Sequence, residues 1–230
     1  MPTSPTSRPA RHSGGPPDRR PTRWAGLAAA DRRAERRTLL LDAAYELLGT
    51  EGWSGTTVRA VCQAARLNPR YFYESFDDLD ALVVAVYDRL VAQLAGEVRA
   101  AVAAAGDDPR AHTRAAIERI VGFIDEDRRR ARVLYVEALG NEALNRRRIE
   151  TGHALVSGVE QHTAERHGPL APGEQIGRIA AAVLVGGTSE LVLAWLDGRI
   201  TVSREQLIDD ATDLFLAVGE AAAAVAARRR

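Results

Sequence analysis

The sequence contains no lysine and only one cysteine. The scarcity of cysteine indicates the redox compartment in which the protein works. Cys62 cannot form a disulfide within the chain, and a composition with so few thiols suits a reducing compartment. We therefore expect a cytoplasmic protein. Because Cys62 falls on the apolar side of a predicted helix, we interpret it as a core residue and not as a redox sensor.

Long apolar runs and strand patterns are also lacking. No segment approaches the roughly 20 consecutive apolar residues of a membrane-spanning helix, and no apolar segment follows the N-terminal arginines as a secretory signal requires. We therefore expect no membrane partner. Apolar residues recur at helical spacing and nowhere alternate with polar ones, which predicts an all-α fold. Helices are expected at about residues 29–49, 58–65, 68–76, 79–105, 109–124, 128–139, 141–167, 174–196 and 203–227.

Patterns that would support catalysis or metal binding are missing as well. The five histidines do not have the spacing of metal ligands, and no acid–base pair stands out. Gly186-Gly187-Thr188-Ser189-Glu190 lies inside a helical pattern, so it is neither a nucleophile elbow nor a phosphate loop. We expect no enzyme activity, no metal and no cofactor. A helical enzyme is the alternative, but it would need a catalytic set that the sequence does not display.

The formal net charge is zero, but the charges are unevenly distributed. Residues 1–75 contain 12 arginines and 7 acidic residues, a net charge of +5, and the remainder carries −5. A cationic N-terminal part favours a nucleic-acid partner. Residues 1–28 are rich in proline and arginine and too poor in apolar residues to fold, so we expect a disordered tail. Whether the arginines of this tail contact DNA stays open.

Residues 56–76 predict two short helices joined by a tight turn. In the first helix, apolar residues share one face, and Thr56 or Thr57 can cap its start. The second helix opens at Asn68, a favourable N-cap, and Pro69 suits the first helical position. Phe72 and Phe76 face inward, which leaves Arg70, Tyr71, Tyr73 and Glu74 on the outward faces. This is the layout of a helix-turn-helix that reads the major groove, although an ordinary helical hairpin has the same periodicity.

The same region resembles the DNA-binding domain of the tetracycline-repressor (TetR) family. The resemblance covers about residues 31–82 and rests on Thr-Thr-Val-Arg at 56–59, Asn-Pro-Arg-Tyr-Phe-Tyr-Glu-Ser-Phe at 68–76, Asp-Leu-Asp-Ala-Leu at 78–82, and the segment from Leu39 to Trp53. Two residues depart from the family pattern. Arg66 stands where the turn usually has a left-handed glycine, which costs about 1–2 kcal/mol. Leu79 stands where the family often has a lysine that faces phosphate.

The resemblance implies a three-helix DNA-binding domain in residues 29–78 and a helical effector-binding and dimerisation domain in residues 79–230. It further implies a homodimer that binds a palindromic operator in double-stranded DNA. We expect a repressor that is released by a small-molecule effector of unknown identity. The alternative within DNA-binding proteins is a constitutive binder without an effector.

Three sets of candidate site residues follow. The expected DNA-binding residues are Arg36, Arg37, Thr56, Thr57, Arg59, Asn68, Pro69, Arg70, Tyr71, Tyr73 and Glu74. Among them, Arg59 and Arg70 are expected to read bases, and Arg36 and Arg37 to contact phosphates. Effector contacts are expected from residues with polar or aromatic ends: Phe123, Tyr135, Glu137, Asn141, His153, Glu190 and Trp195. The resemblance places the dimer interface on the last two helices, with Val183, Gly187, Leu191, Leu207, Leu214 and Val218 as candidates.

Overall fold

The computed structural model describes residues 23–167 and 175–229, and all regular secondary structure in these ranges is helical. The predicted all-α fold is thus confirmed. Most of the predicted N-terminal tail (residues 1–22) lies outside the described residues. The remainder of that tail belongs to the first helix, which begins at Arg23, six residues earlier than predicted. Pro21 is the last helix breaker before this point, and the alanine-rich stretch that follows favours helix.

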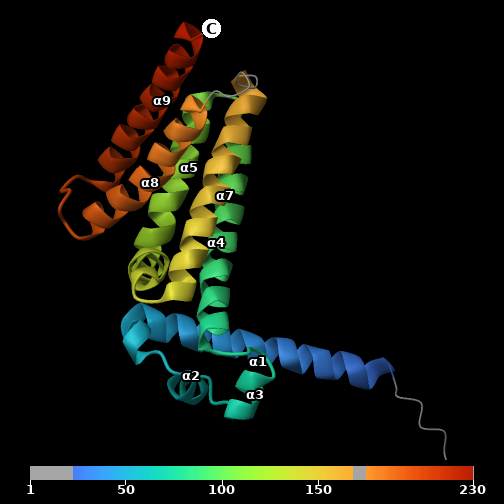
Figure 1. Cartoon of the computed structure of the whole chain (residues 1–230). Coiled ribbons are helices and arrows are strands. Elements are labelled where there is room, and N and C mark those ends of the chain that lie inside the picture. The colour runs from blue at the N-terminus through green and yellow to red at the C-terminus, as the bar shows by residue number, and fades with distance from the viewer. Residues whose placement is uncertain (1–22, 168–174, 230) are drawn as a thin grey trace, which may run out of the picture.

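One long helix and three short elements build the N-terminal part, which we call the reader. They are α1 (Arg23–Thr50), a 3-10 turn (Trp53–Gly55), α2 (Val58–Ala64) and α3 (Pro69–Tyr73). Helix α1 crosses the lower end of the molecule, and α2 and α3 lie on the side of α1 that faces away from the remaining helices (Figure 1). The reader therefore presents α2 and α3 at one extremity of the protein.

The remaining elements form a helical body. Its long helices are α4 (Leu79–Ala104), α5 (Pro109–Glu126), α7 (Glu142–His167), α8 (Ile176–Leu196) and α9 (Arg204–Arg228). Helices α4, α5 and α9 have N-cap residues, Asp78, Asp108 and Ser203, directly before their first residue. The side chains of these caps accept hydrogen bonds from first-turn backbone N–H groups. In Figure 1, α4 rises from the reader and packs against α5 and α7, while α8 and α9 lie at the outer side of the body.

A break in helical pitch separates α5 from α7, where a single helix was predicted over residues 128–139. The chain forms α6 (Arg128–Ala131), then a π-helical turn (Arg132–Val136) and a 3-10 turn (Glu137–Leu139). We call residues 132–139 the irregular segment. The wide turn brings Arg132 and Glu137 into direct contact, with a 2.7 Å hydrogen bond from Nε to the carboxylate, and both side chains lie against the end of α1.

One continuous apolar core joins the two parts. Leu40 of α1, Phe72 of α3, Leu82 of α4 and Ile124 of α5 are fully buried or nearly so, and they belong to the same cluster of contacting side chains. Because this core crosses the boundary between reader and body, the reader cannot change its position without disturbing the packing of α4.

Helix α8 contradicts the expectation that no segment is apolar enough to span a membrane. By length and composition, its 21 residues would suffice, with a mean hydropathy of 1.8 in its most apolar stretch. The sequence argument required an uninterrupted apolar run, and Arg178 and Glu190 punctuate this one. Only 11% of the stretch is buried in the protomer, and Ile179 and Val183 are more than half exposed. The protomer thus has an apolar outer face on α8.

Candidate DNA-binding surface and effector region

The turn between α2 and α3 is set by local hydrogen bonds that the sequence predicts. Thr57 accepts a hydrogen bond from the Ala60 N–H at 3.1 Å, and Asn68 accepts one from the Arg70 N–H at 2.9 Å. Arg66 has a φ of 55°, which confirms the left-handed position predicted for it. No other described residue except glycine has a positive φ. The chain therefore accepts local backbone strain to bring α3 across α2.

Packing against the core determines which side of α3 faces outward. Phe72 is fully buried and Phe76 is 5% exposed, and their rings lie 6.0 Å apart. They meet buried residues of α2, including Val61 and Cys62. Because the inward positions are fixed by these aromatic rings, the remaining positions of α3 must project to solvent.

The outward side of α3 carries aromatic and cationic side chains. The Arg70 side chain is 81% exposed and donates from Nε to Glu74 at 2.9 Å. Tyr71 and Tyr73 are also exposed, Tyr73 by 62%. Arg59, on the neighbouring α2, is exposed as well, as are Thr57, Asn68 and Pro69 at the two helix starts. The structure thus brings most of the predicted DNA-binding residues onto one end of the reader.

Arg36 and Arg37 have structural partners in addition to their position near this surface. The Arg36 guanidinium lies 4.5 Å from the centre of the Tyr71 ring and 3.8 Å from the Glu74 carboxylate. Arg37 donates to the Ser75 carbonyl at 2.8 Å and lies over the Phe76 ring. Both arginines therefore hold α1 against α3. A contact with phosphate would be made by guanidinium groups that already interact with side chains or backbone of the protein.

Thr56 does not belong to the exposed surface, and its assignment to the DNA-binding set needs correction. Its side chain is 2% exposed, and its hydroxyl donates to the Gly52 carbonyl at 2.8 Å. This bond closes the turn around residues 52–56. Thr57, the next residue, takes the exposed capping position that either threonine could have filled.

A cluster of ion pairs joins the reader to the irregular segment, and we call it the junction cluster. Glu137 accepts hydrogen bonds from the Trp53 N–H at 2.6 Å and from Arg132 Nε at 2.7 Å. Arg132 in turn donates to the Thr50 carbonyl at 2.7 Å, at the C-terminal end of α1. The Glu137 side chain is only 12% exposed, so these bonds operate largely out of water.

Gly52 allows this close approach. It has a φ of 77°, and a Cβ atom built there would lie 2.6 Å from an Arg132 nitrogen and 2.8 Å from a Glu137 oxygen. A residue with a side chain would displace both partners. Glycine is thus required at this position for conformation and for space.

A second part of the junction cluster links α1 to the start of α6. The Tyr45 hydroxyl donates to Asp127 at 2.7 Å, and Arg129 donates to both oxygens of the same carboxylate and to Glu46. Hydrogen bonds from Arg129 lower the pKa of Asp127 to about 2, with a further contribution from Tyr45 and against the effect of burial. Burial and then the bond to Asp127 raise the pKa of Tyr45 to about 12. This part of the cluster therefore keeps its charge state over a wide pH range.

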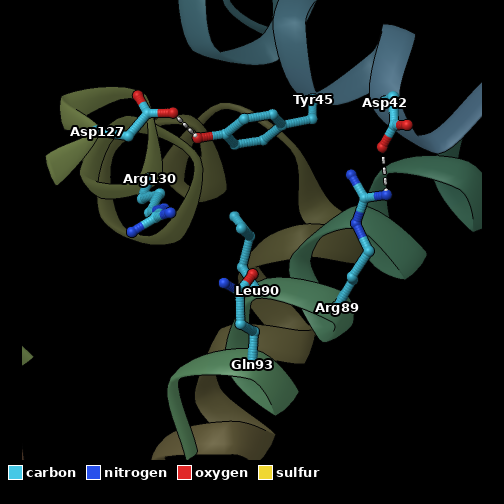
Figure 2. A pocket seen from close by; sticks show the side chains of 7 residues that line it. All are labelled: Asp42, Tyr45, Arg89, Leu90, Gln93, Asp127 and Arg130. Atoms are coloured by element: carbon cyan, nitrogen blue, oxygen red, sulfur yellow. Dashed lines mark hydrogen bonds and ion pairs between the residues drawn. The ribbon is translucent and has the colours of Figure 1, made fainter. Parts of the chain in front are cut away.

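A cleft of about 340 Å³ opens beside these residues, between α1, α4 and α6 (Figure 2). It is lined by Asp42, Tyr45, Arg89, Leu90, Gln93, Asp127 and Arg130. Arg89 pairs with Asp42 at 2.6 Å, and Arg130 donates to the Phe123 carbonyl at 2.6 Å. Since its charged groups already have partners, the cleft marks the boundary of reader and body and offers little free charge to a ligand.

The expected effector residues do not come together in one place. Phe123 is fully buried, Tyr135 has a deeply buried hydroxyl, and Trp195 donates to the Val202 carbonyl at 3.1 Å. Glu137 belongs to the junction cluster. Asn141 caps α7 through the Leu144 N–H and donates to Asp80, so both ends of its amide are occupied. His153 and Glu190 are exposed.

Sequence reasoning named only Tyr135 from a set of polar residues inside the body. Tyr87 of α4 lies near Thr151 and Arg148 of α7, and Tyr135 lies near Tyr87 and near Ser189 of α8. One signal could have found it. Arg148 falls four residues after Leu144, which is fully buried, so a charged residue occupies the apolar side of α7.

The candidate dimer residues differ in their exposure. Val183 and Leu214 are 57% and 64% exposed, Gly187 is exposed, and Leu191 and Val218 are half-buried. Leu207 is only 3% exposed and belongs to the core of the protomer. It was expected at the interface because helical spacing places it on the same stripe as Leu214. The start of α9 is, however, covered by α5, as ion pairs from Arg114 to Glu205 and Asp209 indicate.

Among the side chains that the structure describes, no group of three or more from His, Cys, Asp or Glu could hold a metal ion. The sites that the structure describes are therefore an exposed cationic and aromatic surface on α2 and α3, the junction cluster, and the polar interior of the body.

Comparison with known proteins identifies the reader. Residues 40–86 match the model of bacterial regulatory proteins of the tetR family. A search of curated protein sequences finds no match.

Solved structures have the same fold. The fatty acid degradation regulator FadR from Bacillus halodurans has a TM-score of 0.66 at 15% identity, covering 79% of this chain and 94% of its own. A TetR family transcription regulator from Marinobacter aquaeolei has a TM-score of 0.59 at 19% identity, covering 80% and 97%. The multidrug binding protein EbrR, complexed with imidazole, has a TM-score of 0.56 at 22% identity, covering 78% and 94%. Residues 40–86 therefore match the DNA-binding domain of the TetR family, and the chain as a whole has the fold of these solved regulators.

Proposed function

We propose that the protein is a ligand-responsive repressor that binds a palindromic operator as a homodimer and leaves it when a small-molecule effector binds the helical body. The observation that carries this proposal is the exposed face of α3. Arg70, Tyr71 and Tyr73 project from a capped helix that is held in place by a buried aromatic core. A protein that does not bind DNA has no need to expose this set on its most cationic part.

On this surface, Arg59 and Arg70 are the residues proposed to read bases. An arginine can donate two hydrogen bonds to a guanine in the major groove. Arg70 must exchange its bond to Glu74 for the base, which its 81% exposure permits. Thr57, Asn68 and Pro69 stand at the helix starts, where backbone N–H groups suit phosphates. Such a DNA-binding role places the protein in the cytoplasm.

The proposed homodimer uses the outer sides of α8 and α9. Ile179, Val183 and Leu214 are each more than half exposed, and Gly187 permits close approach of a second helix. Association with a second copy would cover the apolar face of α8, which is otherwise unusual on a protomer. Dimers also place two readers on two half-sites, which is how helix-turn-helix proteins obtain specificity. This assignment leaves out Leu207, since it is already buried.

The effector response is supported by the position of the irregular segment. Tyr135 extends from it into the body, while Arg132 and Glu137 on the same segment contact the reader. A ligand in the body that displaces this segment would act directly on the turn at Trp53. EbrR is described as a multidrug binding protein, which agrees with a ligand site in a body of this fold. No observation favours a helical enzyme.

Binding-site selection from randomised double-stranded DNA tests the proposed function. We expect the full chain to select a palindrome whose half-sites lie about one helical turn apart. Arg70→Ala and Arg59→Ala should each relax the preference at one base pair per half-site, by about 1–3 kcal/mol. Arg99→Ala is the matched control, because Arg99 is exposed on α4 and outside the reader. If both base preferences survive both substitutions, the assignment of base readout to these arginines is wrong.

A second experiment tests the homodimer. Val183→Glu combined with Leu214→Glu should yield monomers in analytical ultracentrifugation and reduce operator affinity by about 100-fold or more, since each half-site is then bound separately. Both side chains are exposed in the protomer, so the fold should persist. Circular dichroism checks this. A folded variant that remains dimeric would place the interface elsewhere.

A further inference from the structure

The interior of the body contains hydrogen-bond donors from four elements but no acidic side chain among them. Tyr87 of α4, Tyr135 of the irregular segment, Arg148 and Thr151 of α7, and Ser189 of α8 are neighbours, and we call them the interior donor cluster. Helix α7 packs against both α4 and α8 (Figure 1). Every member of the cluster can donate a hydrogen bond, and Arg148 is its only permanent charge.

Arg148 lies on the side of α7 that faces the body and is half-buried. Leu144, one turn earlier, is fully buried, and Thr151, one turn later, faces the Tyr87 hydroxyl. The Nε atom of Arg148 is buried and has no hydrogen-bond partner. Its one hydrogen bond in the described structure runs from a terminal nitrogen to Asn145 at 3.3 Å. No carboxylate of the described residues lies within ion-pair distance of its guanidinium.

Two other arginines have a buried Nε without a hydrogen bond, and both differ from Arg148. Arg119 has the Glu97 carboxylate 3.2 Å from its Nε, and Arg36 has the Glu74 carboxylate at 3.8 Å. Their charges are therefore balanced by a nearby acid. Arg148 alone among the three lacks such a partner. Arg148 is half-buried, and its buried Nε is a donor without an acceptor, so an external acceptor would supply the missing hydrogen bond.

We propose that the effector is an organic carboxylate whose head group binds Arg148, with the hydroxyls of Tyr87 and Tyr135 as additional donors. This inference rests on the proposed effector response and specifies its chemistry. A guanidinium and a carboxylate match in geometry and form two parallel hydrogen bonds. One guanidinium balances one negative charge. A phosphate can carry two negative charges and would require a second cation. The adjacent Arg147 cannot serve, because it is already paired with Asp88 and Glu150.

The surroundings of the cluster suit the rest of such a molecule. Val83 and Val86 of α4 and Leu144 of α7 are fully buried apolar residues of the same core. Gly152 of α7, four residues after Arg148, has no atom within 4 Å of the place where a Cβ would stand. The side of α7 next to Arg148 therefore has open space, and apolar core residues lie on the same helices. A carboxylate with an aliphatic body suits both features.

Direct binding of a matched ligand series to the full chain tests this inference without DNA. The probes are octanoate and decanoate, with octanol, octylamine and octyl phosphate as the comparisons, measured by isothermal titration calorimetry. We expect the carboxylates to bind about 10- to 100-fold more tightly than octanol, which corresponds to the contribution of hydrogen bonds to a charged group. Tighter binding of octyl phosphate than of octanoate would overturn the assignment to a carboxylate.

The variants isolate the guanidinium. Arg148→Gln should abolish the preference for octanoate over octanol, whereas Arg146→Gln, on the exposed side of the same helix, should leave it unchanged. Tyr135→Phe should weaken octanoate by a few-fold while removing only one hydroxyl. It gives an independent readout if Arg148→Gln does not fold. Equal octanoate affinity in wild type and a folded Arg148→Gln variant would overturn the inference.

Operator binding separates this inference from the proposed function. If octanoate binds through Arg148 and weakens operator binding, both stand. Arg148-dependent binding that leaves operator affinity unchanged would support the carboxylate site and contradict the effector response. A protein that binds its operator but none of the carboxylates would retain the DNA-binding function and lose this inference.

Discussion

The junction cluster and the interior donor cluster are both polar groups set among apolar residues, but only one of them has balanced charges. At the junction, Arg129 and Arg132 each contact a carboxylate, and backbone groups of α1 and of the turn at Trp53 complete their bonds. In the interior cluster, Arg148 has no carboxylate of the described residues within reach. The difference separates a polar group that holds two parts of a protein together from one that is available to a ligand.

The two clusters should differ in how a substitution changes the free energy of unfolding. A buried ion pair contributes little net free energy compared with apolar packing, but the loss of one partner leaves the other uncompensated and is costly. An unpaired buried charge already bears that cost, and a ligand of opposite charge can remove it. Substitutions in the two clusters should therefore change stability in opposite directions.

The largest effect is expected at Gly52. Gly52→Ala places a Cβ within 3 Å of Arg132 and Glu137 and requires a left-handed residue with a side chain. We expect a loss of about 3–4 kcal/mol in the free energy of unfolding, from strain and from broken junction bonds, measured by urea denaturation. Gly106→Ala is the control, since Gly106 has a φ of 76° but nothing within 4 Å of an added Cβ. It should lose only about 1 kcal/mol, and equal losses would mean that the junction tolerates the side chain.

A smaller loss is expected when the junction carboxylate is neutralised. Glu137→Gln should lower the free energy of unfolding by about 2 kcal/mol, because Arg132 loses its counter-charge in a site that is largely out of water. The control is Glu150→Gln, which removes a 54% exposed carboxylate from Arg147 and should cost less than about 0.5 kcal/mol. Urea denaturation of both variants measures the difference. Similar values would mean that water screens Glu137 as it screens Glu150.

The opposite sign is expected in the interior. Arg148→Met should raise the free energy of unfolding by about 1 kcal/mol in the absence of ligand, because it removes a half-buried guanidinium whose Nε has no hydrogen-bond partner. Arg132→Met, the matched change at the junction, should lower it. Thermal denaturation by circular dichroism reports both. Destabilisation by Arg148→Met would show that the guanidinium has a structural role, and the comparison of the two clusters would then fail.

The last effect is expected only in acid. The pKa of Asp127 is lowered in the folded protein from its usual 3.8 to about 2, so its bonds to Arg129 and Tyr45 contribute stability above pH 4. That contribution is lost as the pH falls from about 4 to about 2. Asp127→Asn should flatten the stability profile in this window and leave the profile between pH 6 and pH 8 parallel to that of wild type. Acid denaturation of both proteins, followed by fluorescence, measures these profiles. If Asp127→Asn loses stability below pH 4 as wild type does, Asp127 is not the source of that loss.

Local patterns in the sequence sufficed for much of the fold and of the reader. Helical periodicity predicted the all-α class, and the caps at Thr57 and Asn68 and the left-handed Arg66 follow from residue types at adjacent positions. Each of these features depends on interactions within a few residues. They could therefore be derived without knowing which helices pack together.

The features that escaped prediction depend on residues far apart in the chain. Glu137 bonds to Trp53 across 84 positions, and this contact accompanies the break in pitch that a single helix over residues 128–139 did not foresee. Leu207 and Leu214 share one stripe of α9, but only the neighbouring helices decide that the first is buried and the second exposed. Periodicity gives the side of a helix on which a residue lies and leaves open what covers that side.

Cys62 gives experimental access to motions of the reader. It is the only cysteine in the sequence, its side chain is 3% exposed in α2, and burial raises the pKa of its thiol. A thiol reagent can therefore modify the protein only when α2 separates from the core. The rate of this modification reports the free energy of local opening of the DNA-binding domain, with no introduced label. Measured with and without operator or carboxylate, it would read the state of the reader directly in the wild-type chain.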